Sequence, residues 1–330
     1  MAKNKHIYNK FFTEEKWAKV NRYNKDAMED FLLELKSAKK SDKTIYQYKS
    51  DLRIFFIWIL ETYDNCPIYE LKKKQLRNFV LHMSDKGMSS NRVNRMKSVI
   101  SSLFTYLEDD DEYSEVEMNY MSKVKSVQKE MVRDIVFLED EEIKLIRDEL
   151  IKREQYQIAL LLSLLYDSGC RKNEAFGVMK DWIDVNGHST KEKVKGKRAK
   201  TFYLYYHDYT IEAYKLYMEQ RGEDDIKELW INHKGEPASI DALYLWIKHC
   251  KNILFELTGK DVELNVHSIR HATATNLSNG TFYMCKRLGK KFELNEIKLL
   301  LNHSDISTTD SYIKRNDEEI LANAFGWDKN

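Results

Sequence analysis

Four short segments of the sequence concentrate residues that could act together on a phosphodiester. They read S-G-C-R-K-N-E (168–174), K-G-K-R-A-K (195–200), H-S-I-R-H (267–271) and L-N-H-S-D-I-S-T-T-D-S-Y (301–312). Cleaving DNA without a metal requires fixed positive charge, because the pentavalent transition state gathers negative charge on the non-bridging oxygens. Arginine suits this role, since its guanidinium stays ionised and binds phosphate through two parallel hydrogen bonds. Arg171 and Arg270 could supply that charge.

The same segments contain the other groups that such a reaction needs. A phenol can attack a phosphodiester and leave again, which makes a covalent intermediate reversible. The departing 5′ oxygen needs a proton, which Lys195 in a basic turn could donate. His267 and His303 could hydrogen-bond the phosphate or transfer protons near neutral pH. The sequence shows no glycine-rich phosphate loop and no metal-ligand spacing, so we expect an enzyme that uses neither ATP, nor a metal, nor another cofactor.

In order and spacing, these residues resemble the tyrosine recombinase (phage integrase) family in its compact Xer-like form. That family orders its catalytic groups as Arg, Lys, His-x-x-Arg, His or Trp, and Tyr. Any one of these residues taken alone would more often be structural or solvated, whereas here all of them occur in the family's order. The resemblance implies the catalytic residues Arg171, Lys195, His267, Arg270, His303 and Tyr312, with Glu174 supporting the first arginine.

The sequence departs from the family's pattern at three places. Asn302 stands where a glycine is usual, and Phe202-Tyr203 stands where Val-Pro is common. The segment Thr281–Phe292 lengthens the gap between the two histidine-containing segments. None of these departures removes a catalytic group.

Hydrophobic periodicity predicts the elements that would position these groups. Apolar residues recur at helical spacing over 24–36, 41–60, 71–84, 89–107, 139–153, 156–166, 209–221, 240–257, 267–278, 294–301 and 317–325. Branched and aromatic residues predict strands over 191–194 and 201–206, joined by the turn G-K-R-A. The predicted fold class is therefore mainly α, with an N-terminal four-helix domain followed by a mostly α domain that carries a small antiparallel sheet.

Composition predicts where the domains divide. The acidic run E-D-D-D-E at 108–112 breaks the helical pattern. We expect a short lead-in (1–23), a helical domain (24–108), an acidic and polar linker (109–134) and a second domain (135–330). The resemblance makes the first domain a core-site DNA-binding domain, through the pattern T-x-x-x-Y-x-x-D-L-x-x-F that begins at Thr44. It makes the second the catalytic domain, which opens on F-L-E-D-E-E at Phe137 and ends in a docking helix.

Charge is segregated along the chain although the formal net charge is only +1. Residues 1–107 carry 21 Lys and Arg against 12 Asp and Glu, whereas residues 108–149 carry 6 against 15. Local basic patches of this kind attract phosphate, although solvated surface charge would explain any single patch. The residues expected to contact double-stranded DNA are Lys43, Thr44, Tyr48, Lys72, Lys73, Lys74, Arg92, Arg95, Lys97, Lys197, Arg198 and Lys200.

Several classes of protein are disfavoured. The first ten residues contain no apolar core of signal-peptide length, and the longest apolar stretches fall short of a membrane span. Four scattered cysteines fit a reducing compartment rather than a disulfide framework or a zinc site. We therefore expect a cytoplasmic, nucleoid-associated protein.

The resemblance implies conservative strand exchange through a 3′-phosphotyrosyl intermediate on Tyr312, in a tetramer assembled on DNA. An apolar face of Ile320, Leu321, Ala324 and Phe325 predicts that residues from about 317 to 327 dock on a neighbouring subunit. Three alternatives remain open. They are the same chemistry with another outcome (relaxation of the topoisomerase IB kind, or hairpin telomere resolution), a catalytically silent DNA-binding regulator, and a metal-dependent nuclease.

Overall fold

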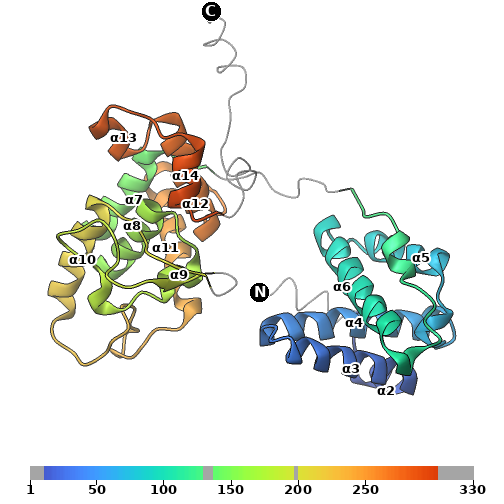
Figure 1. Cartoon of the computed structure of the whole chain (residues 1–330). Coiled ribbons are helices and arrows are strands. Elements are labelled where there is room, and N and C mark those ends of the chain that lie inside the picture. Colours follow the sequence, from blue (N-terminus) through green and yellow to red (C-terminus); the bar gives the residue numbers. More distant parts are fainter. Residues whose placement is uncertain (1–10, 129–136, 197–199, 304–330) are drawn as a thin grey trace, which may run out of the picture. The chain divides into compact units, whose positions relative to one another are not determined.

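The computed structural model describes residues 11–128, 137–196 and 200–303, and the chain divides into two compact units. Unit 1 spans Met1–Asp134 and unit 2 spans Ile135–Asn330 (Figure 1). Both units are built mainly from helices, and the structure contains a small antiparallel sheet. The predicted fold class is confirmed. Within the described ranges, no helix combines the length and the apolar character needed to cross a bilayer.

The helices of unit 1 begin where polar side chains cap them. They are α2 (Glu14–Lys19), α3 (Arg22–Ser37), α4 (Asp42–Thr62), α5 (Lys73–Asp85) and α6 (Ser90–Asp109). Asn21, Ser41 and Ser89 each accept a hydrogen bond from the backbone N–H three residues on, which satisfies an otherwise unpaired donor. Phe79 of α5 packs edge-on against Phe55 of α4, with ring centres 5.0 Å apart. Buried aromatic pairs of this kind hold α5 against α4.

The expected lead-in and linker are folded parts of unit 1 where the structure describes them. Residues 11–23 include α2, and the Arg53 guanidinium of α4 lies over the rings of Phe12 and Trp17. After α6, the chain forms two 3₁₀ turns, Asp111–Tyr113 and Tyr120–Lys123. Their core contacts come from Tyr113, Val116, Met121 and Val124, all of which are buried. Within the expected acidic and polar linker (109–134), the described residues 109–128 therefore include side chains that pack on the core of unit 1.

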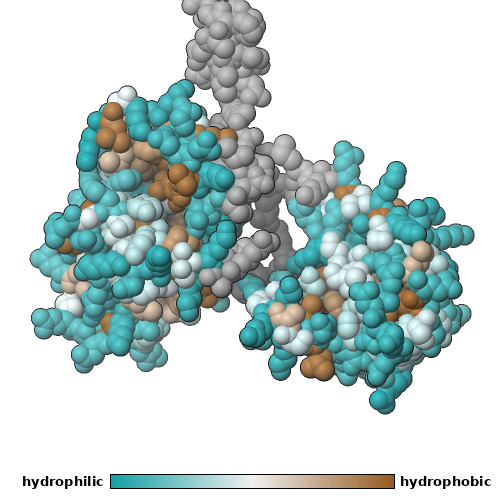
Figure 2. Space-filling view, viewed as in Figure 1, coloured by the Kyte–Doolittle hydropathy of each residue, from teal (hydrophilic) through white to brown (hydrophobic). Residues whose placement is uncertain are grey.

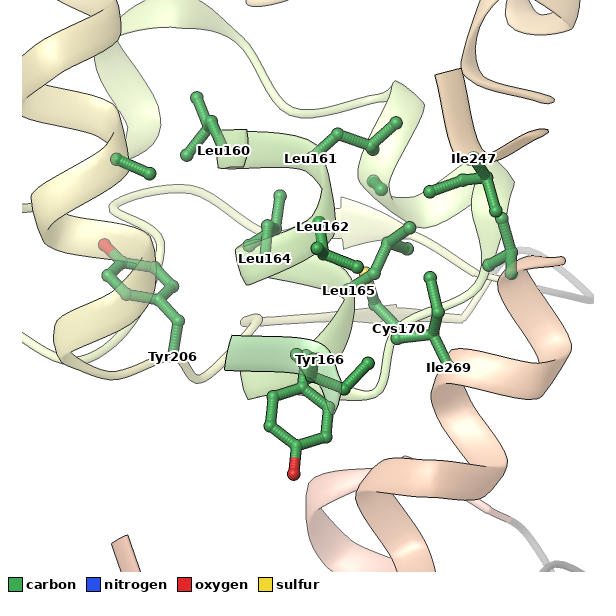
Figure 3. Packing of buried hydrophobic residues seen from close by; sticks show 14 of the residues in the cluster. Leu160, Leu161, Leu162, Leu164, Leu165, Tyr166, Cys170, Tyr206, Ile247 and Ile269 are labelled. Carbon is green, nitrogen blue, oxygen red and sulfur yellow. The ribbon is translucent and has the colours of Figure 1, made fainter. Parts of the chain in front are cut away.

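Unit 2 is organised around one helix that is buried on every side. Every residue of α8 (Tyr156–Ser168) from Ala159 to Ser168 is buried. Figure 3 shows its leucines pointing outwards in several directions, with Tyr206, Ile247 and Ile269 from other segments around them. A fully buried leucine contributes roughly 1.5–3 kcal/mol, so α8 is the main hydrophobic support of this unit. The surrounding helices include α7 (Asp140–Lys152), α10 (Asp208–Arg221), α11 (Ile240–Thr258) and α12 (Val266–Asn279).

The sheet is shorter than the sequence predicts. β1 (Val194–Lys195) pairs antiparallel with β2 (Thr201–Phe202), and Lys195 lies opposite Thr201. Within 201–206, the described structure adds an isolated bridge between Tyr205 and Ser189, so the strand signal in this segment reflects burial of alternate side chains as much as pairing. Leu204 and Tyr206 are buried, whereas Tyr203 and Tyr205 are exposed.

The lengthened segment Thr281–Phe292 contains a short helix, α13 (Tyr283–Leu288), which the periodicity did not predict. Its anchor is Tyr283, whose hydroxyl donates to the buried Asp167 of α8 at 2.8 Å. The Tyr283 ring also stacks on Tyr209 of α10, with centres 3.8 Å apart. The insertion is therefore tied to the core of unit 2 by specific contacts.

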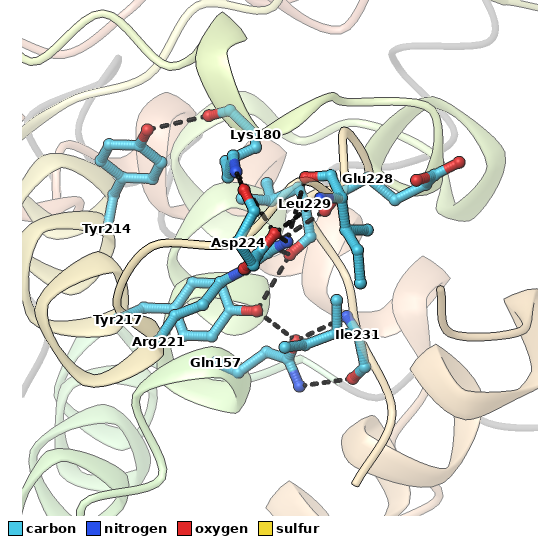
Figure 4. A network of polar contacts seen from close by, with 10 residues as sticks. Gln157, Lys180, Tyr214, Tyr217, Arg221, Asp224, Glu228, Leu229 and Ile231 are labelled. Atoms are coloured by element: carbon cyan, nitrogen blue, oxygen red, sulfur yellow. Dashed lines mark hydrogen bonds and ion pairs between the residues drawn. The ribbon is translucent and has the colours of Figure 1, made fainter. Parts of the chain in front are cut away.

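A second polar network closes the loop that follows α10 (Figure 4). The Arg221 side chain is fully buried, and its guanidinium donates to both carboxylate oxygens of Asp224 and to backbone carbonyls that include those of Glu228 and Leu229. Lys180 adds a contact to the same carboxylate at 3.3 Å. The contacts of Arg221 therefore serve to stabilise this loop.

Most of the surface in Figure 2 is hydrophilic, with apolar side chains gathered over α14 (Leu294–Leu300). Leu299 of this helix is 78% exposed. Helix α14 leads directly into Leu301 and His303, the last described residues. The predicted helix over 317–325 and the expected DNA contacts Lys197 and Arg198 lie outside the described residues.

Candidate active site

Arg270 joins three segments of unit 2 at one point. Its side chain is completely buried on α12. Its Nη1 donates to the Gly169 carbonyl at 2.5 Å, and its Nη2 donates to the Leu301 carbonyl at 2.7 Å. These bonds fix the guanidinium between the end of α8 and the end of α14. A guanidinium held in this way needs no reorganisation when an anion arrives.

Gly169 allows this convergence. It ends α8 with φ of +58°, in the left-handed region that favours glycine. A Cβ built on Gly169 would lie 2.2 Å from Leu301 Cδ2, so any side chain would displace Leu301. The backbone of the S-G-C-R segment can therefore approach the L-N-H segment closely enough for Arg270 to bridge them.

Arg171 is held by the acid that the sequence predicted to support it. Its backbone N–H donates to Glu174 Oε2 at 2.7 Å, and its Nη1 donates to Glu174 Oε1 at 3.0 Å. Glu174 is buried on the short helix α9 (Lys172–Phe176), whereas 30% of the Arg171 side chain is exposed. The buried Glu174 carboxylate thus holds the partly exposed Arg171 guanidinium in one orientation.

The hairpin that carries Lys195 lies against α9. Gly196 comes so close that a Cβ built on it would lie 2.5 Å from Phe202 Cε1 and 3.4 Å from Glu174 Oε1. Lys195 itself is exposed on β1. Lys200 is also exposed, and its carbonyl accepts the Gly196 N–H at 2.7 Å. The structure therefore places the hairpin beside the Arg171–Glu174 pair.

Both predicted histidines lie within the electrostatic reach of both arginines. Burial lowers the pKa of His303 to about 3, and the Arg270 and Arg171 charges add to the shift. Partial desolvation also lowers the pKa of His267, again with contributions from Arg270 and Arg171. Two imidazoles that are kept neutral beside two guanidiniums give this region a positive potential that suits an anionic phosphate.

The chain turns sharply just before His303. Asn302 has φ of +50°, a conformation that asparagine tolerates better than most residues other than glycine. The asparagine that replaces the usual glycine therefore performs the same backbone task. The His303 N–H then donates to the Lys298 carbonyl at 3.1 Å, which fixes the start of the next segment to α14.

The structure thus brings Arg171, Glu174, Lys195, Arg270 and His303 into one region, with His267 at the start of the same helix as Arg270. Tyr312, the expected nucleophile, lies outside the described residues. Within the parts of the chain that are described, no group of three or more side chains is arranged to hold a metal ion.

The basic residues at the start of α5 are exposed, and one of them already has partners within the chain. Lys72 Nζ lies 3.1 Å from Glu117 Oε2 and 4.9 Å from the centre of the Tyr120 ring. Lys73 and Lys74 are exposed on the first turn of the helix. A duplex would therefore meet two lysines directly and would compete with Glu117 for the third.

The expected contacts on α4 differ in what they can offer a duplex. Lys43 is exposed, and the Thr44 hydroxyl lies 2.9 Å from the Ser41 hydroxyl at the helix start. Tyr48 is partly buried, and its ring stacks on Phe31 with centres 6.3 Å apart. Packing therefore accounts for much of the Tyr48 side chain.

Arg92 and Arg95 on α6 are less exposed than expected. Both bind Asp51 of α4, whose side chain is completely buried. Lys97 Nζ lies 3.4 Å from Ser126 Oγ. Both arginines are partly exposed, and their contact with DNA stays a prediction. Sequence patterning missed the contact of both arginines with Asp51, and the one signal was an acid followed directly by the apolar run L-R-I-F-F-I-W.

Comparison with known proteins identifies the family. Residues 136–319 match the phage integrase family, and residues 27–113 match the N-terminal SAM-like domain of phage integrases. The chain belongs to the phage integrase family. Its enzymes, the tyrosine recombinases, break and rejoin DNA, and the resemblance inferred from the sequence is confirmed.

Individual phage integrase relatives extend over most of the chain. The SPbeta prophage-derived recombinase-like protein YomM of Bacillus subtilis (strain 168) is 25% identical over 311 residues, which cover 90% of this chain and 89% of YomM. Tyrosine recombinase XerC of Treponema denticola is 26% identical over 295 residues, covering 84% and 90%. The solved structure of a lambda integrase dimer bound to a COC′ core site shares the fold, with a TM-score of 0.63 at 15% identity, covering 92% of this chain and 79% of that one.

Because folded His303 is kept neutral in this member of the phage integrase family, we predict that the free energy of unfolding depends on pH. An unfolded histidine binds a proton below about pH 6.5, whereas folded His303 does not until about pH 3. The unfolded state therefore binds more protons between these values, and the free energy of unfolding falls as pH falls, by up to about 1.4 kcal/mol per pH unit. We expect His303→Gln to remove this contribution.

Urea denaturation at a series of pH values measures the effect. The control is His233→Gln, which removes an exposed imidazole from the same unit. The wild type and His233→Gln should lose stability more steeply on acidification than His303→Gln. Curves of equal slope for all three proteins would show that His303 is not held neutral.

Proposed function

We propose that this protein is a site-specific DNA recombinase that exchanges strands through a 3′-phosphotyrosyl intermediate without ATP or a metal. The observation that carries the proposal is that Arg171 and Arg270 both lie close enough to His267 and His303 to lower the pKa of each imidazole. Family membership supports the same reading. A cytoplasmic, nucleoid-associated location follows from a DNA substrate.

The proposed reaction begins with Tyr312. Its hydroxyl loses its proton to solvent, the phenolate oxygen attacks the scissile phosphorus, a P–O bond to tyrosine forms, and the bond to the 5′ oxygen breaks. Lys195 gives a proton to the departing 5′ oxygen, which leaves as a hydroxyl. A 5′ hydroxyl from the partner duplex then attacks the phosphotyrosine and releases the phenol. Bond energy is conserved in the phosphotyrosine, so the overall reaction consumes no nucleotide.

The groups around the phosphate have distinct tasks in this reaction. Arg270 and Arg171 bind the non-bridging oxygens, and their charge offsets the negative charge of the pentavalent transition state. His267 and His303 act as neutral hydrogen-bond donors to the same phosphate, because desolvation, with the charges of Arg270 and Arg171 adding to it, disfavours their protonated forms. Glu174 positions Arg171.

Unit 1 is proposed to bind the duplex through its phosphates. Lys43, Lys73 and Lys74 are exposed and basic, and phosphate contacts of this kind set the register of a protein on DNA without reading bases. The lambda integrase structure was solved with a core site, which supports duplex DNA as the partner.

Product analysis tests the reaction class. A plasmid that carries two copies of the recognition site is incubated with the protein in EDTA. Strand exchange gives deletion or inversion products, depending on the relative orientation of the sites. Relaxed topoisomers alone would indicate chemistry of the topoisomerase IB kind, hairpin ends would indicate telomere resolution, and loss of activity in EDTA would indicate a metal-dependent nuclease. Site binding without any product would favour a silent regulator.

We also propose that the active assembly is a tetramer in which residues from about 317 to 327 dock on a neighbouring subunit. Ile320, Leu321, Ala324 and Phe325 give this segment an apolar face when placed at helical spacing. Deletion of 317–330 should leave binding to a single site unchanged and should abolish the slower-migrating synaptic complex in a native gel. Full recombination by the truncated protein would contradict the docking proposal.

A further inference from the structure

Unit 1 contains a buried carboxylate beneath two arginines. The Asp51 side chain is completely buried on α4. Arg95 donates from Nε to Asp51 Oδ2 at 3.1 Å and from Nη2 to Oδ1 at 3.3 Å. Arg92 forms an ion pair with the same carboxylate through Nη2. One acid on α4 therefore holds two guanidiniums that lie one turn apart on α6.

The two arginines remain accessible on their outer sides. The Arg92 side chain is 24% exposed and the Arg95 side chain is 40% exposed. A guanidinium has five N–H donors, and Asp51 engages two of those of Arg95. One carboxylate and two guanidiniums also leave a net charge of +1 at the surface. The cluster therefore offers both donors and charge to an anion.

Arg221 of unit 2 provides a comparison, because it is an arginine whose contacts stabilise the fold. The Arg221 side chain is fully buried, and Asp224 and backbone carbonyls take up its donors (Figure 4). In unit 1 the arrangement is reversed, because the acid is buried and the arginines reach the surface. The pKa of Asp51 is raised to about 6, because the effect of burial outweighs the opposing effect of Arg95. Burying a carboxylate is costly, and here two guanidiniums form ion pairs with it.

We propose that Asp51 is a positioning residue that holds Arg92 and Arg95 as one preformed binding site for a phosphate of the DNA backbone. The inference rests on the proposed function, since it assumes that unit 1 binds a duplex. Fixing both guanidiniums before binding removes the entropy that two flexible side chains would otherwise lose. It also presents paired N–H groups in the geometry that phosphate oxygens accept.

The proposal predicts that Asp51→Asn changes the affinity for DNA in the direction opposite to the one expected from its change in net charge. Asp51→Asn raises the net charge of the protein by one, which by itself would strengthen attraction to DNA. If Asp51 positions the arginines, the variant binds DNA more weakly instead, by about tenfold. The matched control is Asp85→Asn, which makes the same change of charge at an exposed position of unit 1.

The measurement is fluorescence anisotropy of the full-length protein on a labelled mixed-sequence duplex over a range of salt concentrations. Phosphate contacts are independent of sequence, so the recognition site is not required. We expect Asp85→Asn to bind as tightly as the wild type or slightly more tightly. Asp51→Asn should bind more weakly, and its plot of log affinity against log salt should flatten by about one unit of slope. Equal affinities for the two variants would overturn the proposal.

A double-mutant cycle separates positioning from folding. Once Arg92→Gln and Arg95→Gln are both present, Asp51→Asn should cause no further loss of affinity, because nothing remains to position. Loss of the same size in both backgrounds would mean that Asp51 acts only through general stability. Thermal unfolding followed by circular dichroism identifies a temperature at which every variant is folded, and the affinities are compared at that temperature.

If Asp51→Asn does not fold, a comparison of two double variants still tests the proposal. Arg92→Gln with Arg95→Gln should weaken binding more than Lys36→Gln with Lys40→Gln, which removes the same charge from exposed positions of unit 1. Equal losses would refute a preformed site. A wild-type protein that binds no duplex would instead refute the proposed function itself, whereas wild-type binding with no effect at this cluster would refute only the inference.

Discussion

Arg270→Lys is expected to lower the rate of DNA cleavage by at least about a hundredfold while leaving duplex binding nearly unchanged. The guanidinium of Arg270 spans the Gly169 and Leu301 carbonyls and presents a rigid plane to the phosphate. A lysine keeps the charge, but its single ammonium cannot bond two carbonyls and also bind a phosphate in a bidentate way. The loss should therefore appear in the chemical step.

Single-turnover formation of the covalent complex on a nicked duplex measures this step. Arg153→Lys is the control, because Arg153 in the same unit forms ion pairs with Glu149 and Glu256 away from the site. The control should react at the wild-type rate. The buried carbonyls lose charged donors in Arg270→Lys, so its melting temperature must be determined and the assay run well below it. A rate close to that of the wild type would exclude Arg270 from the catalytic centre.

The second large effect is expected from Gly169→Ala. The substitution imposes a left-handed conformation on alanine, which costs about 1 kcal/mol. It also drives a methyl group into Leu301, and overpacking of this kind costs roughly a further 1–3 kcal/mol. Because Leu301 precedes His303 by two residues and accepts from Arg270, the displacement should also slow cleavage by the folded protein.

Gly259→Ala is a matched control for this prediction. Gly259 also ends a helix in the left-handed region, with φ of +71°, but a Cβ built on it meets nothing within 4 Å. It should therefore show the backbone penalty without the clash. Urea denaturation of both variants isolates the packing contribution as the difference between them. If the two substitutions cost the same free energy, Gly169 is needed for its backbone conformation alone.

Local sequence patterns were enough to predict most helices of the fold. The apolar spacing in 41–60 and 89–107 corresponds to α4 and α6 within one or two residues at either end. The mostly apolar run at 156–166 becomes α8, whose residues from Ala159 onwards are all buried. These elements were predictable because each signal depends on neighbouring residues within one helix.

The order of the motifs predicted a common site for Arg171, Glu174, Arg270 and His303, and these residues lie in one region of unit 2, while their catalytic roles stay predictions. The closeness of Gly169 to Leu301 was not predictable, because it depends on packing between segments more than a hundred residues apart. The role of Asn302 was also invisible until its backbone angle was known.

The contacts that sequence patterning missed have a common cause. Asp51 and its arginine partners lie about forty residues apart in sequence, and no local pattern links an acid on one helix to cations on another. In the same way, the acidic run at 108–112 suggested a solvated linker, although the side chains that follow it pack on the core of unit 1. A charged residue in the sequence therefore indicates an exposed side chain only when no distant residue of the chain contacts it.

Covalent capture of DNA is the most direct test of the account. The protein is mixed in EDTA with a duplex that carries the recognition site and a nick beside the scissile phosphate, so that cleavage releases a short strand and cannot be reversed. We expect a denaturation-resistant protein–DNA band from the wild type and none from Tyr312→Phe, which keeps the ring but lacks the nucleophile. A band that persists in Tyr312→Phe, or tight binding to the site without any band from the wild type, would contradict the proposed mechanism.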